Sequence, residues 1–318
     1  MNSGGDVNGL IEGMLAGNVR ALTRLMTLVE NRAELVPVVM RAIYTRRAPA
    51  RRIGIAGPPG AGKSTLLSNL MRDGFARGLR VAALCIDPTS PLSGGALLGD
   101  RIRIADITDR DDVFVRSVAS GESLGGLAEA TKYHTLLLEA AGYNLIFIET
   151  VGLGQVGYDI RNIAETLLLL LVPESGDTVQ ILKSGIIELA DVVVVNKSDR
   201  AGADEIAHSL ELTFETPRDG WRIPVIRTIA RDDAGTAEIV SAAAAHYEYL
   251  KESGRLSRRR DPGADLLEAL CLDFKRRLAA GLLEKNHAAR DIAAAVAVGK
   301  TDPYSAAERI LKLLLKDA

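Results

Sequence analysis

A glycine-rich segment near the start of the chain constrains the fold more than any other feature. Residues 57–64 read Gly-Pro-Pro-Gly-Ala-Gly-Lys-Ser, between a short apolar run at 53–56 and an amphipathic stretch rich in leucine. In such a strand–loop–helix unit the glycines let successive backbone N–H groups turn toward anionic oxygens, and the helix N-terminus adds a favourable dipole. Lys63 supplies a positive charge for the β- and γ-phosphates, and Ser64 places a hydroxyl for Mg²⁺. The segment predicts a P-loop nucleotide site, because a chance glycine turn does not explain the Lys-Ser pair and its setting.

Short apolar runs alternate with longer amphipathic stretches from residue 52 onward. Most of these runs are continuously apolar, which is typical of strands buried on both faces of a parallel sheet. Helices between parallel strands give right-handed crossovers. The fold class is therefore α/β, a P-loop NTPase with a doubly wound, mainly parallel sheet. The predicted strands are residues 53–56, 81–86, 113–115, 145–148, 167–172, 192–195 and 224–227.

Helical patterns flank this alternating region on both sides. Residues 7–47 repeat apolar positions at spacings of three and four, and Pro37 interrupts them, so two helices are expected there. Beyond residue 235 helices are predicted at 239–251, 265–284, 288–298 and 303–315. The predicted division is an N-terminal helical extension at 1–50, a P-loop domain at 51–252 and a C-terminal helical arm at 253–318.

Composition excludes several classes of protein. With 39 Lys and Arg against 41 Asp and Glu, the chain lacks the basic surplus of a nucleic-acid binder. The one dense basic run, Arg258-Arg259-Arg260, is interpreted as a solvated linker or helix end. The most apolar run, 167–172, is far shorter than the roughly 20 residues that span a bilayer. Two cysteines, Cys85 and Cys271, build no disulfide framework, and with no secretory signal pattern a cytoplasmic location is expected.

A second motif, Asn196-Lys197-Ser198-Asp199, follows the apolar run 192–195. A carboxylate placed there accepts hydrogen bonds from both N1–H and the 2-amino group of guanine. Adenine has an acceptor at N1 and no 2-amino group, so the same carboxylate would be unpaired. A bidentate base contact discriminates by about 1–3 kcal/mol. The string alone is weak and could be a solvated turn, but its place after a buried strand predicts that Asp199 selects guanine.

A third motif, Glu149-Thr150-Val151-Gly152, follows the run 145–148 and faces the γ-phosphate edge of the nucleotide. Glu149 can hold Mg²⁺ directly or through water. A backbone N–H from Gly152 to the γ-phosphate would be lost on hydrolysis, which distinguishes GTP from GDP. Asp87 and Asp100 are further candidate carboxylates, although each alone is more often a cap or turn residue. No residue stands out as a catalytic base, so slow hydrolysis is expected.

Together these motifs resemble the MeaB/ArgK-type G-protein chaperones of adenosylcobalamin-dependent acyl-CoA mutases, which include the methylmalonic aciduria type A protein. The strings at 87–91, 94–103, 123–127 and 149–155 carry the resemblance beyond generic GTPases. The resemblance implies a P-loop sheet with an N-terminal helical extension and a C-terminal arm that forms a homodimer. It also implies a role: gating the loading, protection or reactivation of the mutase's cobalamin through GTP hydrolysis.

The resemblance also assigns residues. It implies that Ser64, Asp87, Asp100 and Glu149 meet Mg²⁺, and that Lys183, on a mobile loop, reaches the nucleotide when the partner is bound. The predicted catalytic set is Lys63, Glu149, Gly152 and Lys183. The predicted nucleotide-binding set is Gly57, Pro58, Pro59, Gly60, Ala61, Gly62, Lys63, Ser64, Thr65, Asn196, Lys197 and Asp199.

Two departures from the family pattern fall in the switch segments. Val156-Gly157 stands where the family usually has Ser-Glu, and Thr178-Val179 changes the loop before Lys183. Both leave open which mutase is the partner, methylmalonyl-CoA mutase or a sister enzyme acting on another acyl-CoA.

Two other functions stay open at this stage. A metal-inserting GTPase, such as a nickel chaperone, needs a Cys/His cluster, and the histidines are scattered over positions 134, 208, 246 and 287. A P-loop kinase would usually use ATP, and Asp199 argues against that.

Overall fold

A parallel sheet of seven strands organises the first part of the chain. The strands are β1 (Arg51–Ala56), β2 (Val81–Asp87), β3 (Val113–Ala119), β4 (Leu145–Glu149), β5 (Thr166–Leu171), β6 (Val192–Asn196) and β7 (Val225–Thr228). Their order is β3-β2-β4-β1-β5-β6-β7, and every pairing is parallel. The seven predicted strands and the α/β class are thus confirmed. Because β1 lies between β4 and β5, the loop after β1 leaves the sheet where the strand order reverses, the usual ligand position in such sheets.

The computed structural model describes residues 3–87, 112–119, 126–150, 160–173, 186–260, 270–271, 287–297 and 300–314. They fall into two compact units, Met1–Arg260 and Asp261–Ala318. The second unit contains α14 (His287–Ala297) and α15 (Pro303–Leu314), which match two predicted helices. The predicted helix 265–284 lies outside the described residues except for 270–271. Within the described helices, none is long and apolar enough to cross a membrane.

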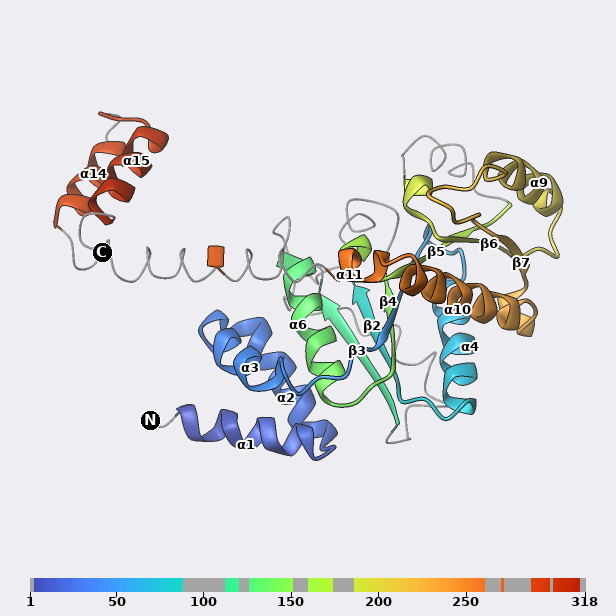
Figure 1. Cartoon of the computed structure of the whole chain (residues 1–318), viewed down its shortest axis with the longest axis horizontal. Helices are drawn as coiled ribbons and strands as arrows, with labels where there is room; N and C mark the ends of the chain where they lie inside the picture. Colours follow the sequence, from blue (N-terminus) through green and yellow to red (C-terminus); the bar gives the residue numbers. More distant parts are fainter. Residues whose placement is uncertain are drawn as a thin grey trace. The chain divides into compact units, whose positions relative to one another are not determined.

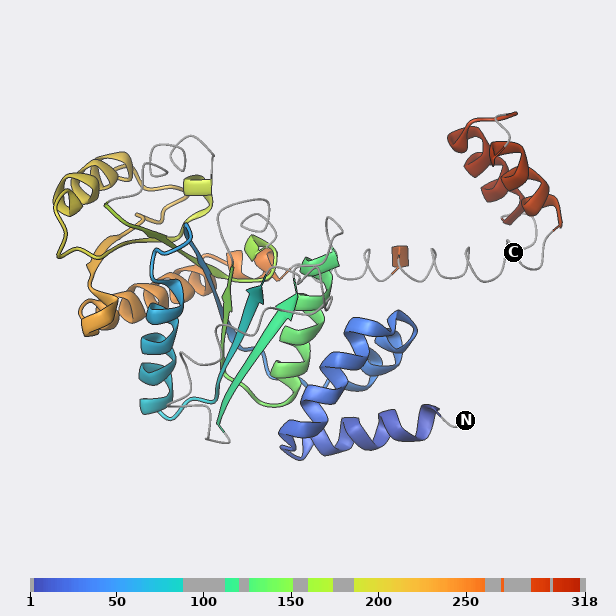
Figure 2. The same ribbon diagram turned by 180° about the vertical axis from the view of Figure 1, so that it is seen from behind.

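Helices cover both faces of the sheet, as Figures 1 and 2 show. One face packs against α4 (Lys63–Ala76) and α10 (Thr236–Glu252), and its core includes Leu67, Leu168 and Ile239. The other face packs against α6 (Gly126–Ala140), α9 (Ala203–Thr213) and the N-terminal helices. Successive leucines of β5 point to opposite faces, so Leu167 and Leu168 belong to different cores. This explains why the run is apolar throughout.

The N-terminal extension contains three helices rather than the two that Pro37 suggested. They are α1 (Ser3–Leu15), α2 (Val19–Asn31) and α3 (Val36–Ile43), with a 3₁₀ turn, η1 (Ala33–Leu35), before the last. Gly17, at φ +91°, ends the first, and Asn18 caps the second by accepting from the backbone N–H of Arg20 at 2.9 Å. Pro37 stands in the first turn of α3, where a missing N–H breaks no intrahelical bond.

A buried carboxylate, Asp191, gathers cationic side chains at the start of β6. Arg161 donates to it, and two nitrogens of Arg259, the last residue of α11 (Arg255–Arg259), lie 3.0 Å from its two oxygens. Nε2 of His246 lies 3.3 Å from Oδ1. Burial favours the neutral carboxyl, but the Arg259 hydrogen bond and the charges of His246 and Arg161 lower the pKa of Asp191 to about 2. The basic run at 258–260 therefore ends a helix, as expected, but Arg259 is paired rather than solvated.

Candidate nucleotide-binding site

The predicted phosphate loop connects β1 to α4, and its glycines are required by close contacts. Gly62 precedes α4 with φ +93°, and a Cβ there would lie 2.3 Å from Nδ2 of Asn196. A Cβ on Gly57 would lie 2.6 Å from the carbonyl oxygen of Leu170. Both distances are shorter than any tolerated contact, so side chains are excluded at both positions. The absence of side chains at these two positions lets the phosphate loop lie in close contact with the carboxyl ends of β5 and β6.

Lys63 lies inside the curve of this loop. Its Nζ donates to the carbonyl oxygens of Gly57 and Pro58, each at 3.0 Å, and the residue is only 7% exposed. A phosphate oxygen is a stronger partner for an ammonium group than a neutral carbonyl. The geometry therefore holds the charge of Lys63 where an anion in the loop can take over its hydrogen bonds.

Ser64 and Glu149 meet beside the loop. Oγ of Ser64 donates to Oε1 of Glu149 at 2.8 Å, and both residues are buried. The contact arises because β1 and β4 are adjacent parallel strands, so the first turn of α4 and the end of β4 share one edge of the sheet. A hydroxyl and a carboxylate are the hard oxygen ligands that Mg²⁺ prefers, and the pair fits the predicted metal site.

The other predicted residues around the phosphates are only partly described. Asp87 ends β2, which pairs with β4, so its backbone belongs to the same sheet edge as Glu149. Asp100, Gly152 and Lys183 lie outside the described residues, as do both departures, Val156-Gly157 and Thr178-Val179.

A pocket of about 140 Å³ lies beside the Asn-Lys-Ser-Asp motif. The side chain of Asn196 fixes two segments that line this pocket. Its Nδ2 donates to the carbonyl of Ala61 at 2.6 Å, and its Oδ1 accepts from the N–H of Ala230 at 3.0 Å. Asn69 of α4 donates to the carbonyl of Ala230 at 2.7 Å. Asn196 thus ties the phosphate loop to the segment after β7. The lining residues are Gly62, Thr65, Asn196, Lys197, Asp199, Arg200, Ile229, Ala230 and Arg231.

Asp199 lines this pocket with its carboxylate paired to Arg231. Nη2 of Arg231 lies 3.2 Å from Oδ2 of Asp199, and the Arg231 side chain is 72% exposed. Exposed ion pairs of this kind are weak because solvent screens both charges, so donors from a base can displace the arginine. Lys197 has φ 57°, which turns the chain sharply between β6 and Asp199.

The segment after β7 is a part of the site that the sequence did not reveal. Residues 229–231 form one wall of the pocket, with Ala230 fixed by Asn196 and Arg231 paired to Asp199. No motif marks them. Only the topology could have indicated their role. Residues 229–231 follow a predicted parallel strand, and residues at the carboxyl ends of such strands meet at one edge of the sheet.

The phosphate loop, the Ser64–Glu149 pair and the Asn196 pocket lie on one edge of a seven-stranded P-loop sheet. A protein-family model described as "Methylmalonyl Co-A mutase-associated GTPase MeaB" matches residues 22–278, which is most of the chain. The chain belongs to the MeaB family. This result confirms the resemblance that the sequence motifs indicated.

Individual relatives agree with this assignment. A putative GTPase of Pyrococcus abyssi is 43% identical over 317 residues, covering 97% of both chains. GTPase ArgK of Escherichia coli is 35% identical over 254 residues, covering 77% of each. The methylmalonic aciduria type A homolog, mitochondrial, of Caenorhabditis elegans is 34% identical over 80% of this chain and 69% of its own length.

A solved structure matches over nearly the full length. The crystal structure of an LAO/AO transport system kinase superposes with a TM-score of 0.69 and 25% identity, covering 99% of both chains. Together, the family model, the GTPase relatives and this structural match show that the chain is a P-loop GTPase. It binds guanine nucleotide and hydrolyses GTP. Among the residues that the structure describes, no group of three or more His, Cys, Asp or Glu side chains is placed to hold a metal ion together.

Proposed function

We propose that this MeaB-family GTPase is a chaperone of an adenosylcobalamin-dependent acyl-CoA mutase. In this role, GTP binding and hydrolysis gate the loading, protection or reactivation of the mutase's cobalamin. The observation that carries the proposal is the match of residues 22–278 to a family described as mutase-associated. The similarity to a methylmalonic aciduria type A homolog supports the same role. The partner is methylmalonyl-CoA mutase or a sister mutase.

At the phosphates, the proposal assigns binding to groups that already face the loop. Lys63 exchanges its two carbonyl partners for oxygens of the β- and γ-phosphates, which stabilises the charge that develops during phosphoryl transfer. Ser64 and Glu149 would hold Mg²⁺, together with Asp87 and Asp100. When bound, the metal would neutralise negative charge that develops on the phosphates during transfer. Asp199 selects guanine by accepting from its N1–H and its 2-amino group.

The switch in this proposal begins directly after Glu149. The metal-holding carboxylate ends β4, and Gly152, three residues on, would sense the γ-phosphate through its backbone N–H. Loss of that contact on hydrolysis would release the segment that follows. Lys183 would enter the site when the mutase is bound and add a positive charge, as accelerating groups do for other GTPases. Turnover would therefore be slow for the isolated chaperone, which we propose acts as a homodimer formed through residues 253–318.

Steady-state GTP turnover with and without purified acyl-CoA mutases tests the proposal. We expect the correct mutase to accelerate hydrolysis by an order of magnitude or more, and the K63A variant to remain inactive with it. A parallel cobalamin-transfer assay, followed by the cofactor's absorbance, should depend on GTP. A lack of acceleration and of transfer with every available acyl-CoA mutase would contradict the chaperone role while leaving GTPase activity unaffected.

A further inference from the structure

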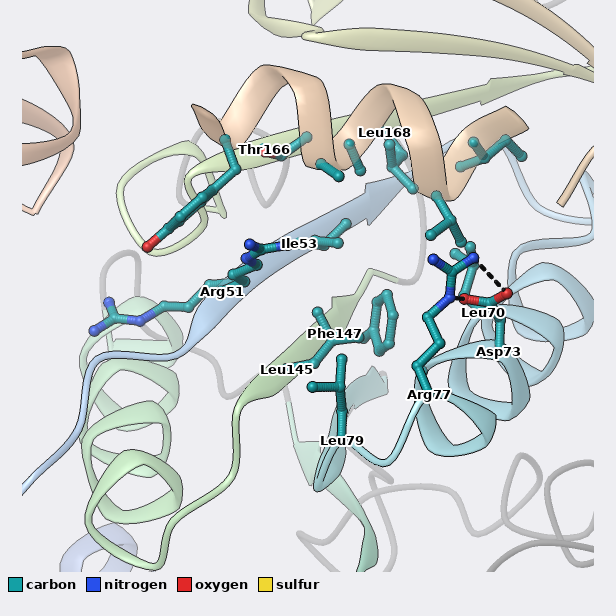
Figure 3. A pocket seen from close by; sticks show the side chains of 17 residues that line it. Arg51, Ile53, Leu70, Asp73, Arg77, Leu79, Leu145, Phe147, Thr166 and Leu168 are labelled. Atoms are coloured by element: carbon teal, nitrogen blue, oxygen red, sulfur yellow. Dashed lines mark hydrogen bonds and ion pairs between the residues drawn. The ribbon is translucent and has the colours of Figure 1, made fainter. Parts of the chain in front are cut away.

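An apolar cavity of about 100 Å³ lies between α4, α10 and the sheet, well away from the phosphate loop. Its floor is formed by β1, β4 and β5 through Ile53, Phe147 and Leu168, and Leu70 of α4 and Ala243 of α10 form its walls. Figure 3 shows Ile53, Leu70, Phe147 and Leu168 around the open space. All of these residues belong to the first compact unit.

Small side chains on α10 leave this space open. Along α10 the lining begins with Ile239 and Val240 and ends with Tyr247, and between them the helix presents only Ala243 and Ala244 to the cavity. Protein interiors are close-packed, with few voids larger than a water molecule. An engineered apolar cavity of about 150 Å³ in another protein takes up benzene, so a space of this order accepts a ring or a short branched chain. The size and lining of the cavity fit a small apolar group.

The mouth of the cavity adds a charge preference. Arg51 and Arg77 stand on opposite sides of it (Figure 3), with side chains 46% and 55% exposed. Arg51 lies 3.4 Å from Glu248, and Arg77 lies 2.6 Å from Asp73. Solvent screens pairs at such exposure and leaves them weak, so a ligand carboxylate can compete for either guanidinium.

Three arginines and one acid, Asp73, line the cavity. Each arginine has an acidic partner: Arg52 pairs with the buried carboxylate of Glu139, 2.7 Å away, Arg51 with Glu248 and Arg77 with Asp73. The pairs of Arg51 and Arg77 are the exposed ones, so these are the guanidiniums that a ligand can reach. The ring of Tyr247, another lining residue, lies under the guanidinium of Arg51, 4.8 Å from centroid to Cζ.

The cavity opens at the end of the sheet opposite to the nucleotide. Arg51, Leu145 and Thr166, which line it, are the first residues of β1, β4 and β5. The phosphate loop leaves the last residue of β1, and six residues of strand span about 20 Å. A ligand here and a nucleotide can therefore bind at the same time.

We propose that this cavity is a binding site for a small carboxylic acid. The apolar body of the ligand, about the size of a benzene ring, fills the space beneath Ala243, and its carboxylate replaces the acidic partner of one rim guanidinium, that of Arg51 or of Arg77. The site is independent of the mutase partnership.

Calorimetric titration of the full chain, saturated with GDP, tests the site with benzoate as the probe and benzyl alcohol as its neutral counterpart. We expect one saturable benzoate site per chain and about tenfold weaker binding of the alcohol, since a charge-assisted hydrogen bond is worth about 1.4 kcal/mol or more here. The A243L variant should lose binding because leucine fills the cavity. The matched A245L variant, altered on the exposed face of the same helix, should keep it.

A second variant keeps the test decisive if A243L fails to fold. Replacing both exposed guanidiniums, R51Q with R77Q, should abolish the preference for benzoate over benzyl alcohol. No saturable benzoate binding, equal binding of the two probes by the wild type, or full binding by a folded A243L chain would each overturn the proposal.

Discussion

Oγ of Ser64 donates a hydrogen bond of 2.8 Å to Oε1 of Glu149, a residue 85 positions further along the chain. One belongs to the first turn of α4 and the other ends β4, so the sheet topology brings them together. Both are buried, and a buried carboxylate is stable only with charge or hydrogen-bond compensation. A divalent cation bound by the same two oxygens would supply that compensation.

Replacing Glu149 by glutamine should uncouple nucleotide affinity from Mg²⁺. The amide oxygen can still accept from Ser64, so the fold should persist, but the charge that favours the metal is removed. We expect the Kd for GTP in Mg²⁺ to rise at least about tenfold, a loss of roughly 1.4 kcal/mol, and the Kd in EDTA to stay unchanged. Titration of a fluorescent GTP analogue measures both, with exposed Glu252→Gln as the control. An unaltered Mg²⁺ dependence would remove Glu149 from the metal site.

Gly62→Ala should abolish nucleotide binding. The added Cβ would lie 2.3 Å from Nδ2 of Asn196, and moving that amide breaks its bond to Ala61 in the phosphate loop. Gly78→Ala is the matched control: it also has positive φ, +76°, but nothing lies within 4 Å of its Cβ. It should cost about 1–2 kcal/mol of backbone strain and leave GDP affinity intact. Equal GDP affinity in the two variants would show that the Asn196 contact is dispensable.

Asp199→Asn should move the preference of the pocket from guanine toward xanthine. The amide nitrogen can donate to O2 of xanthine, whereas the carboxylate pairs with the donors of guanine. A bidentate contact discriminates by about 1–3 kcal/mol, so we expect the ratio of the GTP and XTP dissociation constants to shift by about 5- to 150-fold. Competition binding of the two nucleotides on the same variant measures that ratio without a separate control. An unchanged ratio would place base recognition on other residues, such as those at 229–231.

Much of the fold and of the phosphate site could be predicted because the signals are local. Buried parallel strands are continuously apolar, and the phosphate loop is one unbroken string whose spacing is set by backbone geometry. The far wall of the base pocket could not be predicted, because it depends on contacts between distant segments: Asn196 and Asn69 with Ala230, 34 and 161 residues apart, and Asp199 with Arg231. The residue types alone do not indicate that these side chains meet.

Tertiary contacts and position within an element override composition at two places. Pro37 predicts a break between two helices, yet it lies in the first turn of α3, where proline is tolerated. The basic run at 258–260 predicts a solvated linker or a helix end; it does end α11, but Arg259 and Arg260 pair with Asp191 and Glu165, which lie 68 and 95 residues away. Sequence alone gives no access to partners at that distance.

Asp191→Asn should destabilise the first unit strongly. The substitution leaves the guanidiniums of Arg161 and Arg259 beside a neutral amide in a buried setting. Removing one partner of a buried ion pair costs about 3–5 kcal/mol. Urea unfolding followed by circular dichroism measures the loss. Asp219→Asn removes an exposed acid paired with Arg255, and it should cost no more than about 1 kcal/mol. Similar costs for the two variants would contradict a structural role for the Asp191 cluster.

Two buried histidines should make stability fall at mildly acidic pH. Burial, with the nearby charge of Arg116, lowers the pKa of His134 to about 3, although its Nε2 faces the carbonyl of Met26. Burial lowers the pKa of His246 to about 4, against the opposing charge of Asp191. The ordinary value of 6.5 applies to the unfolded chain. Below pH 6.5 the unfolded chain therefore takes up protons that the folded chain does not, and folding stability decreases.

The expected slope is about 1.4 kcal/mol per pH unit for each histidine, acting from about pH 6.5 down to the folded pKa of each. Free energies of unfolding measured in urea at pH 7.5, 6 and 5 should therefore decline, and most steeply over the last interval. His134→Gln should flatten the decline, because glutamine takes up no proton in either state. His208→Gln, at a side chain 71% exposed, is the matched control and should leave the slope unchanged. If the two variants show the same slope as the wild type, the buried histidines do not set the acid sensitivity of the fold.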